Sequence, residues 1–171
     1  MAKSASKLSL NVSPSVSAVS AVSAADERWM EEALRCAQRA LEAGEVPVGA
    51  VVVCDGQVVG RGWNRNLIDC DPTAHAEIVA LREAGRSLGN HRLGACELFA
   101  TIEPCAMCAG AAVHARLRRL VYGADDPKAG AAHSVLQVLN HPKLNHRMEV
   151  QAGVLAGRAA EMLQEFFRNR R

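Results

Sequence analysis

The chain has 171 residues, of which 49% are hydrophobic and 4% aromatic, and its formal net charge is +2. This length and apolar fraction are typical of one globular domain that buries a real core. No apolar run approaches the roughly 20 residues that a membrane-spanning helix needs, so no membrane span is predicted.

Residues 1–25 consist mainly of Ser, Ala and Val and contain no acidic residue before Asp26. Serines interrupt any apolar stretch, which argues against a secretory signal. An organelle transit peptide is the alternative, because such peptides are Ser-rich and acid-poor, but no arginine precedes Arg28. We expect a disordered N-terminal extension at 1–25 and a folded domain at 26–171.

The first half of the domain starts with a helix followed by a hairpin. From Asp26 the apolar residues recur at helical spacing, and Gly44 is expected to end this helix. Strands are then predicted at Val48–Cys54 and Gln57–Arg61. The two residues between them, Asp55-Gly56, are a strong signal for a tight hairpin turn.

A loop, a helix and a strand follow. The loop is expected at Trp63–Pro72, and the helix runs from near His75 to about Ala84, with Gly85 after it. Glu97–Thr101 is a predicted strand that leads into a helix at Pro104, a residue that suits the first helical position.

The last third is expected to alternate again between strands and helices. A strand is predicted at Arg118–Tyr122, a loop at Gly123–His133, a short helix at Ser134–Leu139, a short strand at Met148–Gln151 and an amphipathic helix from Leu155 to Phe167. This order of elements predicts a three-layer α/β/α sandwich around a central mixed sheet of about five strands.

Two segments carry residues with a specific chemistry: His75-Ala76-Glu77 and Pro104-Cys105-Ala106-Met107-Cys108. Zn²⁺ prefers nitrogen and sulfur ligands, and a catalytic zinc site keeps one of its four positions open for water. The two cysteines are three residues apart and therefore share one face of a helix. We predict a zinc site with three protein ligands, His75, Cys105 and Cys108.

Glu77 completes this pattern as a carboxylate that is not a ligand. First-turn side chains lean toward the helix N-terminus, so His75 and Glu77 can both approach a metal there, and Thr73 is a candidate cap for this helix. A Cys-x-x-Cys pair alone is also typical of a redox pair or of half a structural zinc site. The upstream His-x-Glu and the proline before Cys105 favour a catalytic site.

The combined pattern resembles the signature of the zinc nucleoside deaminases. In that class zinc activates a water molecule, and the glutamate carries one water proton to a ring nitrogen and, in a separate step, protonates the departing ammonia. The resemblance therefore implies that Glu77 is the catalytic acid and base. The motif alone does not choose between a cytosine and an adenine substrate.

From about residue 27 to its end, the chain further resembles the bacterial tRNA adenosine deaminases. The matching segments are Glu45-Val46-Pro47-Val48-Gly49-Ala50, Gly62-Trp63-Asn64-Arg65, Asp71–Glu77, Glu103-Pro104-Cys105, Met107–Ala111, Asn145-His146-Arg147 and Phe166-Phe167-Arg168. This family implies a cytidine deaminase-like fold and a homodimer with one zinc ion per subunit. It also implies conversion of the wobble adenosine of a tRNA anticodon loop to inosine, with tRNA-Arg carrying an ACG anticodon as the expected partner.

Carried over position by position, the resemblance assigns substrate contacts to Glu45, Val48, Asn64, Ala76, His114, Asp126, Lys128, Asn145, Phe167, Arg168 and Arg170. Asn64 would hydrogen-bond the flipped nucleoside, and Val48 would pack on its base. Glu45 would support the pocket floor, and the Ala76 amide would read the purine edge. Ordinary structural roles are the alternative: a core valine, a turn asparagine, a capping glutamate and, for His114, a surface histidine.

Two positions depart from the family: Asp125 stands where members commonly carry a basic or apolar residue, and Ala129 stands where they carry Thr. The acidic Asp125 puts the RNA contacts of its loop in question. Basic residues gather at 114–119, 141–147 and 168–171, although each cluster alone would be an ordinary solvated face. The six cysteines do not resemble a secreted disulfide framework, which indicates a reducing compartment such as the cytoplasm.

Two other functions compete with this interpretation. A deaminase of free nucleobases or nucleosides, of the guanine or cytosine type, would share the zinc site but would need neither the basic segments nor the Phe166-Phe167-Arg168 ending. A non-catalytic zinc module that binds RNA is the second alternative. Glu77 argues against it, because a structural site needs no general base and prefers four protein ligands.

Overall fold

A computed structural model describes residues 22–170, so the expected disordered extension lies almost wholly outside the described residues. The first helix, α1 (Ala24–Glu42), begins two residues before the expected Asp26. Its start is fixed by a capping box: the Ser23 hydroxyl accepts the N–H of Asp26, and the Asp26 carboxylate accepts the N–H of Ser23.

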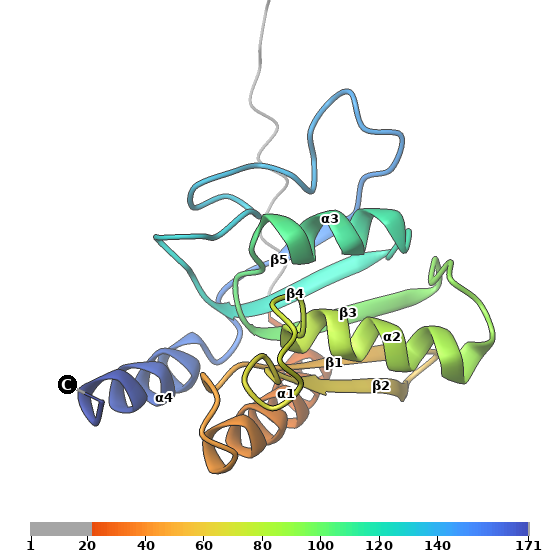
Figure 1. The fold of residues 1–171 in the computed structure, drawn as a ribbon. Helices are drawn as coiled ribbons and strands as arrows, with labels where there is room; N and C mark the ends of the chain where they lie inside the picture. Colours follow the sequence, from red (N-terminus) through yellow and green to blue (C-terminus); the bar gives the residue numbers. More distant parts are fainter. Residues whose placement is uncertain (1–21, 171) are drawn as a thin grey trace, which may run out of the picture.

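A mixed sheet of five strands forms the middle layer, in the order β2-β1-β3-β4-β5 (Figure 1). The strands are β1 (Gly49–Cys54), β2 (Gln57–Trp63), β3 (Cys96–Ile102), β4 (Arg119–Ala124) and β5 (Glu149–Gln151). β1 is antiparallel to both of its neighbours, whereas β3, β4 and β5 run parallel. The predicted hairpin joins β1 to β2, with left-handed φ angles of 49° at Asp55 and 73° at Gly56.

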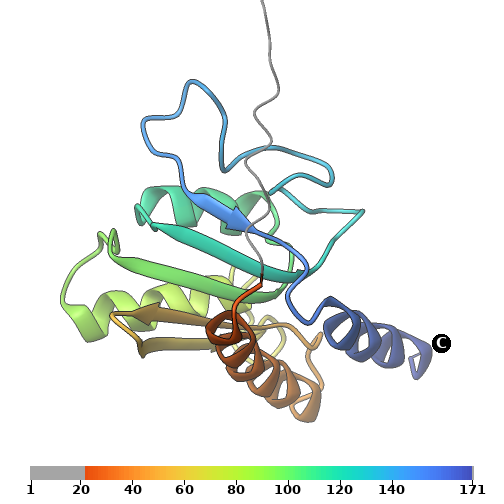
Figure 2. The same cartoon turned by 180° about the vertical axis from the view of Figure 1, so that it is seen from behind.

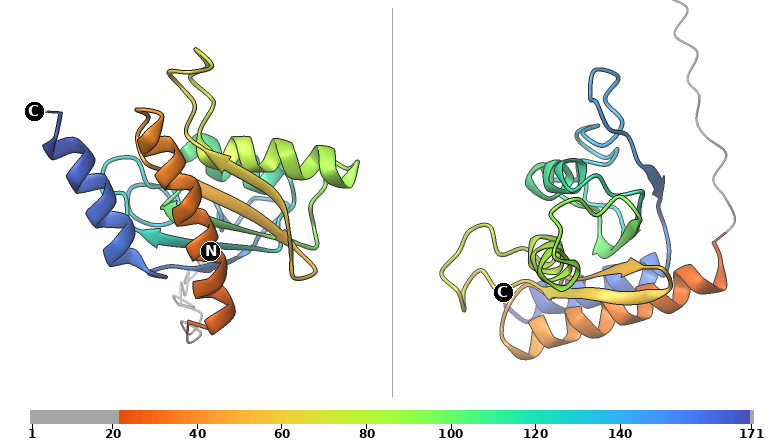
Figure 3. Two further views of the ribbon diagram at one scale, coloured as in Figure 1. Left: turned by 90° about the horizontal axis from the view of Figure 1, so that it is seen from below. Right: turned by 90° about the vertical axis from the view of Figure 1, so that its right-hand side faces the viewer.

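Helices cover both faces of this sheet (Figures 2 and 3). On one face lie α2 (Ala76–Leu88) and α3 (Ala106–His114), and on the other lie α1 and α4 (Ala156–Arg168). Successive strand residues point to opposite faces: Val52 packs in the core beneath α2 and α3, and Val51 packs against α1. The prediction of a three-layer α/β/α sandwich is confirmed.

Two helix boundaries differ from the prediction. α2 runs through Gly85 and ends at Leu88, followed by Gly89 with a left-handed φ of 60°; its N-cap is His75 rather than Thr73. α3 begins at Ala106 with Cys105 as its N-cap, so Pro104 precedes the helix instead of occupying its first turn.

The prediction of a short helix at Ser134–Leu139 is wrong, because this segment is irregular, with turns only at its two ends. Its amide groups bond outside a helical pattern: Val135 and Leu136 both donate to the carbonyl of Gly130, and Val138 donates to that of Ala131. The segment from β4 to β5 instead arches past α3 (Figure 1). Within residues 22–170, no helix is both long enough and apolar enough to cross a membrane.

α2 lies unusually close to the sheet because β2 presents glycines to it. A Cβ atom added at Gly62 would lie 2.0 Å from the carbonyl oxygen of Ala76, and one added at Gly60 would lie 2.3 Å from that of Ala80. The contact is therefore made by backbone atoms and methyl groups. This close approach fixes the position of the first turn of α2, where His75 and Glu77 lie.

We expect Gly62→Ala to lower the free energy of unfolding by about 1–3 kcal/mol, because the new methyl group meets helix backbone that cannot move aside cheaply. Gly157→Ala is the matched control, since Gly157 lies in α4 with nothing near its added Cβ. That change should be neutral or stabilising by up to about 1 kcal/mol. Urea unfolding of both variants measures the difference, and equal stability would show that α2 is not held in this way.

Candidate metal centre and active site

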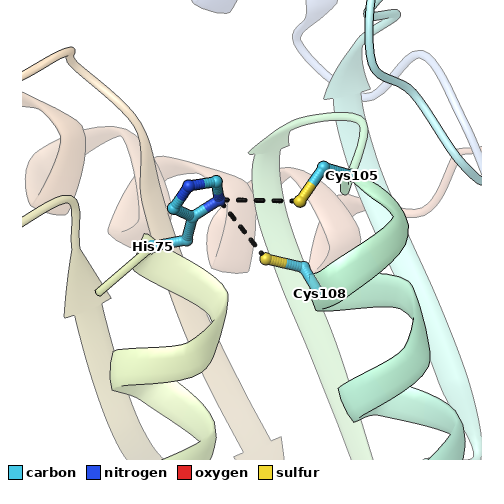
Figure 4. Close-up of side chains that lie close together, drawn as sticks. All are labelled: His75, Cys105 and Cys108. Atoms are coloured by element: carbon cyan, nitrogen blue, oxygen red, sulfur yellow. Dashed lines mark hydrogen bonds between the residues drawn. The ribbon is translucent and has the colours of Figure 1, made fainter. Parts of the chain in front are cut away.

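The N-termini of α2 and α3 lie side by side and bring three metal-binding side chains together (Figure 4). His75 is the N-cap of α2, Cys105 is the N-cap of α3, and Cys108 lies in the first turn of α3. His75 Nδ1 is 3.6 Å from the Sγ atom of each cysteine. All three ligand atoms lie within 4.8 Å of one another.

These distances fit a tetrahedral zinc ion. With Zn–N and Zn–S bonds of about 2.0–2.1 and 2.3 Å, tetrahedral angles separate nitrogen and sulfur by about 3.6 Å. The donor set of one imidazole and two thiols also matches the preference of zinc. Three side chains fill three positions of a tetrahedron, so a fourth position is left for a non-protein ligand.

The site is arranged for negative charge on sulfur. Hydrogen bonds from Cys108 and from His75 lower the pKa of Cys105 to about 3. The pKa of Cys108 is raised, by its hydrogen bond to Cys105 and by burial. The two thiols thus share a proton, and a bound cation that displaces this proton would stabilise both thiolates.

Glu77 lies beside this cluster in the first turn of α2, and only 3% of it is exposed. Burial raises the pKa of Glu77 above its usual range, and its carboxyl group contacts the Cys108 thiol. A buried carboxylate with a raised pKa is a stronger base than an exposed one, which suits Glu77 to accept a proton beside this cluster.

Three of the expected substrate-binding residues meet at the same place. Asn64 is largely buried, and its Oδ1 accepts the N–H of Ala76 at 2.9 Å. Val48 is buried in the same core cluster as Ala76, and its carbonyl accepts the N–H of Asn64. The Ala76 amide, expected to read a purine edge, is therefore engaged by Asn64 in this structure.

Glu45 acts on the loop before α2. It is 2% exposed, and its Oε1 accepts the N–H groups of both Leu67 and Ile68, at 2.8 and 2.9 Å. Within the same loop, the Arg65 guanidinium donates two hydrogen bonds to the Asp69 carboxylate. Glu45 therefore shapes the loop that leads to His75, rather than lining the cluster itself.

The remaining expected contacts have other partners or are exposed. Asp126 forms a local turn by accepting the N–H groups of Lys128 and Ala129, and Lys128 is exposed. Asn145 is exposed and held by Arg116, which donates to its carbonyl and to its Oδ1. His114 ends α3, roughly 12 Å along that helix from its first turn.

At the C-terminus, Phe167 is 52% exposed, whereas Phe166 is buried. Arg168 is also exposed. Arg170 has a structural contact: its guanidinium lies 4.2 Å from the Phe166 ring centroid and donates to the carbonyl of Gly44.

Sequence reasoning assigned no role to Glu103, which organises the loop over Cys105. This side chain is 1% exposed, and its two oxygens accept five hydrogen bonds, from the amides of Asp126, Ala132, His133 and Ser134 and from the Ser134 hydroxyl. In the sequence, only its position directly before Pro104-Cys105 pointed to a role near the site.

A second cluster of possible metal ligands contains Glu103, Asp125 and His133. His133 Nδ1 lies 2.6 Å from the Tyr122 hydroxyl, and its Nε2 lies 3.7 Å from Asp125. The hydrogen-bonding capacity of Glu103 is already used by the loop. We therefore interpret this cluster as a structural anchor, in which the unexpected Asp125 pairs with His133.

An α/β/α sandwich with a His/Cys/Cys cluster and a buried glutamate at paired helix N-termini defines a protein of the deaminase class. A family model described as MafB19-like deaminase matches residues 24–171. The tRNA-specific adenosine deaminase of Haemophilus influenzae is 48% identical over 85% of both chains, and that of Agrobacterium fabrum is 47% identical over 84% of this chain and 94% of its own. The chain belongs to the family of tRNA-specific adenosine deaminases.

Solved structures agree with this assignment. A structure from a study of A-to-I editing by tRNA:A34 deaminases superposes with a TM-score of 0.77 at 46% identity, over 80% of this chain and 99% of the other. The guanine deaminase from Nitrosomonas europaea is less similar, with a TM-score of 0.69 at 28% identity over 82% of this chain and 83% of its own.

We expect Glu103→Gln to lower the free energy of unfolding by about 2 kcal/mol or more near neutral pH, because an amide NH₂ would face N–H donors. Burial alone would raise the pKa of Glu103, but hydrogen bonds from Ser134, His133 and Asp126 outweigh it and lower this pKa to about 2. A carboxylate with a depressed pKa stabilises the fold above its ordinary pKa of 4.5 and loses that contribution as the pH falls toward 2.

The difference between wild type and Glu103→Gln should therefore shrink between about pH 5 and pH 3 in urea unfolding. Glu161→Gln, an exposed carboxylate in α4, is the control and should differ little from wild type at any pH. A Glu103→Gln protein as stable as wild type at neutral pH would contradict the anchoring role.

Proposed function

We propose that the protein hydrolyses the wobble adenosine of a tRNA anticodon loop to inosine, with release of ammonia. One observation carries the proposal: buried Glu77 lies beside a His/Cys/Cys cluster in a chain 48% identical to a tRNA-specific adenosine deaminase. The 6-amino group leaves adenine, and the oxygen of a water molecule takes its place at C6.

In this proposal His75, Cys105 and Cys108 hold one zinc ion per chain. When bound, zinc supplies the Lewis acidity that lowers the pKa of a water molecule toward neutrality. Glu77 accepts one proton of the attacking water and passes it to a ring nitrogen of the base. It then accepts the second proton, from the new hydroxyl group at C6, and delivers it to the departing amino group. Burial raises the pKa of Glu77 and so makes it a stronger base for accepting the proton of the water.

The base-binding pocket is proposed at the junction of Val48, Asn64 and Ala76. Val48 supplies an apolar wall, and Asn64 supplies a fixed hydrogen-bonding group. Because Oδ1 of Asn64 accepts the N–H of Ala76, its side-chain NH₂ is the donor offered to the nucleoside. Ala76 then acts by orienting Asn64, and Glu45 acts by holding the Leu67–Ile68 backbone in place.

RNA contacts are proposed for residues outside this pocket: His114, Asp126, Lys128, Asn145, Phe167, Arg168 and Arg170. Single-stranded loops are bound by aromatic stacking and by cations near phosphates. Exposed Phe167 and Arg168 suit these roles best. Arg170 has the additional task of docking α4 onto Gly44.

The proposed partner is the anticodon stem-loop of tRNA-Arg with an ACG anticodon, and the proposed assembly is a homodimer. The proposed catalytic domain is 26–171. Cysteine usage supports a reducing compartment, and we propose the cytoplasm, since the described cysteines are all free. A deaminase of free bases is the alternative, supported by the shared fold of the Nitrosomonas europaea guanine deaminase.

Turnover on different substrates tests the proposed function. We expect inosine formation in an ACG anticodon stem-loop and little product from free adenosine, cytidine or guanine. Glu77→Gln should lower turnover by roughly 10²-fold or more while RNA binding persists, because an amide keeps the shape but cannot carry protons. Glu83→Gln, an exposed carboxylate on the same helix, is the matched control. Turnover of free bases without turnover of RNA would favour the alternative.

Metal content tests the ligand assignment separately. Purified protein should contain close to one zinc ion per chain. The Cys105→Ala, Cys108→Ala double variant should lose this zinc together with activity, since a single imidazole remains. Cys36→Ala should keep both, because Cys36 is buried between α1 and the sheet. Stoichiometric zinc in the double variant would show that the ligands lie elsewhere.

A further inference from the structure

Two cysteines outside the metal cluster face each other across neighbouring strands. Cys54 is the last residue of β1, and Cys96 is the first residue of β3. These strands are antiparallel, and their register places Cys54 directly opposite Cys96. Both cysteines are free thiols in the structure, and the proposed deamination uses neither.

The backbone hydrogen bonds of Cys96 identify the type of this pair. Its N–H donates to the carbonyl of Leu93 at 2.9 Å, and its own carbonyl accepts the N–H of Arg118 at 3.0 Å. Cys96 and Cys54 therefore do not exchange two backbone bonds and form a non-hydrogen-bonded pair. In such pairs the Cα atoms are about 4.5 Å apart, within the range of about 4.4–6.8 Å seen for disulfides.

The two thiols differ in accessibility. Cys54 is partly exposed at the hairpin, whereas Cys96 is only 1% exposed. Burial and a hydrogen bond with Cys54 raise the pKa of Cys96 to about 12, so Cys96 is a poor first nucleophile. An oxidant would therefore reach Cys54 first, with Cys96 in place as the resolving thiol.

We propose that Cys54 and Cys96 form a reversible disulfide between β1 and β3 when the protein meets a hydroperoxide. The Cys54 sulfur attacks the peroxide, the O–O bond breaks, and Cys54 becomes a sulfenic acid as an alcohol or water leaves. The Cys96 sulfur then attacks the sulfenic sulfur, an S–S bond forms, the S–O bond breaks, and water leaves with the Cys96 proton. Two electrons pass from the thiols to the peroxide, and a small dithiol reverses the bond by exchange.

The position of the pair separates this chemistry from the metal centre. Cys96 lies at the start of β3, whereas Cys105 follows shortly after the end of this strand. A strand of this length spans about 20 Å. The disulfide can thus form while His75, Cys105 and Cys108 keep their metal, and the proposal holds whatever the substrate of the enzyme.

Peptide mapping of the zinc-loaded, full-length protein tests the proposal without any variant. The protein is treated with hydrogen peroxide, alkylated, and digested without reduction by trypsin and a glutamyl endopeptidase, which cleaves at Glu97 and so separates Cys96 from Cys105. Oxidation of Cys70, which is exposed, reports that the dose was sufficient. We expect most of the protein to carry a Cys54–Cys96 link that dithiothreitol removes, with zinc content unchanged.

Variants test the order of the steps. Cys96→Ala should leave Cys54 as a sulfenic acid that dimedone traps, and Cys54→Ala should leave Cys96 as a free thiol. Cys36→Ala is the matched control and should keep the link, because Cys36 is equally buried but faces no cysteine. If Cys54 and Cys96 both remain alkylatable after Cys70 has been oxidised, or if Cys54 links to another cysteine, the proposal is wrong.

Discussion

The close contact between α2 and β2 is the constraint on which the site depends. Gly60 and Gly62 leave no side chain between strand and helix, so Ala76 and Ala80 rest on the strand backbone. On the same face, small residues of α3 such as Ala109 and Ala112 pack into the shared core. Two helices can therefore begin beside each other at one end of the sheet. The cluster of His75, Cys105 and Cys108 is a consequence of this packing.

Helix N-termini suit the chemistry that is placed there. Unpaired amide groups and the helix dipole favour negative charge at the start of a helix, which stabilises thiolates and carboxylates. The same region is buried, and burial by itself raises the pKa of Glu77. A bound cation would resolve this conflict by stabilising the thiolates of Cys105 and Cys108. Glu77 would then be the one group of the cluster that can gain or lose a proton while all three ligands of the cation stay in place.

Local patterns in the sequence predicted most of the fold and the core of the site. Glycine and Asp-Gly signals marked the hairpin, and the His-x-Glu and Cys-x-x-Cys spacings identified the residues that converge. The segment 134–139 was predicted wrongly, because its amides bond to the distant Glu103 side chain and to the carbonyls of Gly130 and Ala131 earlier in the same loop, contacts that no local pattern reveals. The start of α3 differed because Cys105 takes an extended backbone as a cap, with Pro104 outside the helix. The engagement of the Ala76 amide by Asn64 likewise depends on tertiary structure.

The contact of Arg170 with Gly44 connects the last helix to the segment that carries Glu45. Gly44 directly precedes Glu45, whose carboxylate fixes the backbone of Leu67 and Ile68, and that loop leads to His75. The end of α4 is thus linked, through three hydrogen bonds, to the loop that leads to His75, the first of the proposed metal ligands. A tag or fusion partner attached after Arg170 would therefore disturb the hydrogen bond between Arg170 and Gly44, whereas one attached before Ser23 would not.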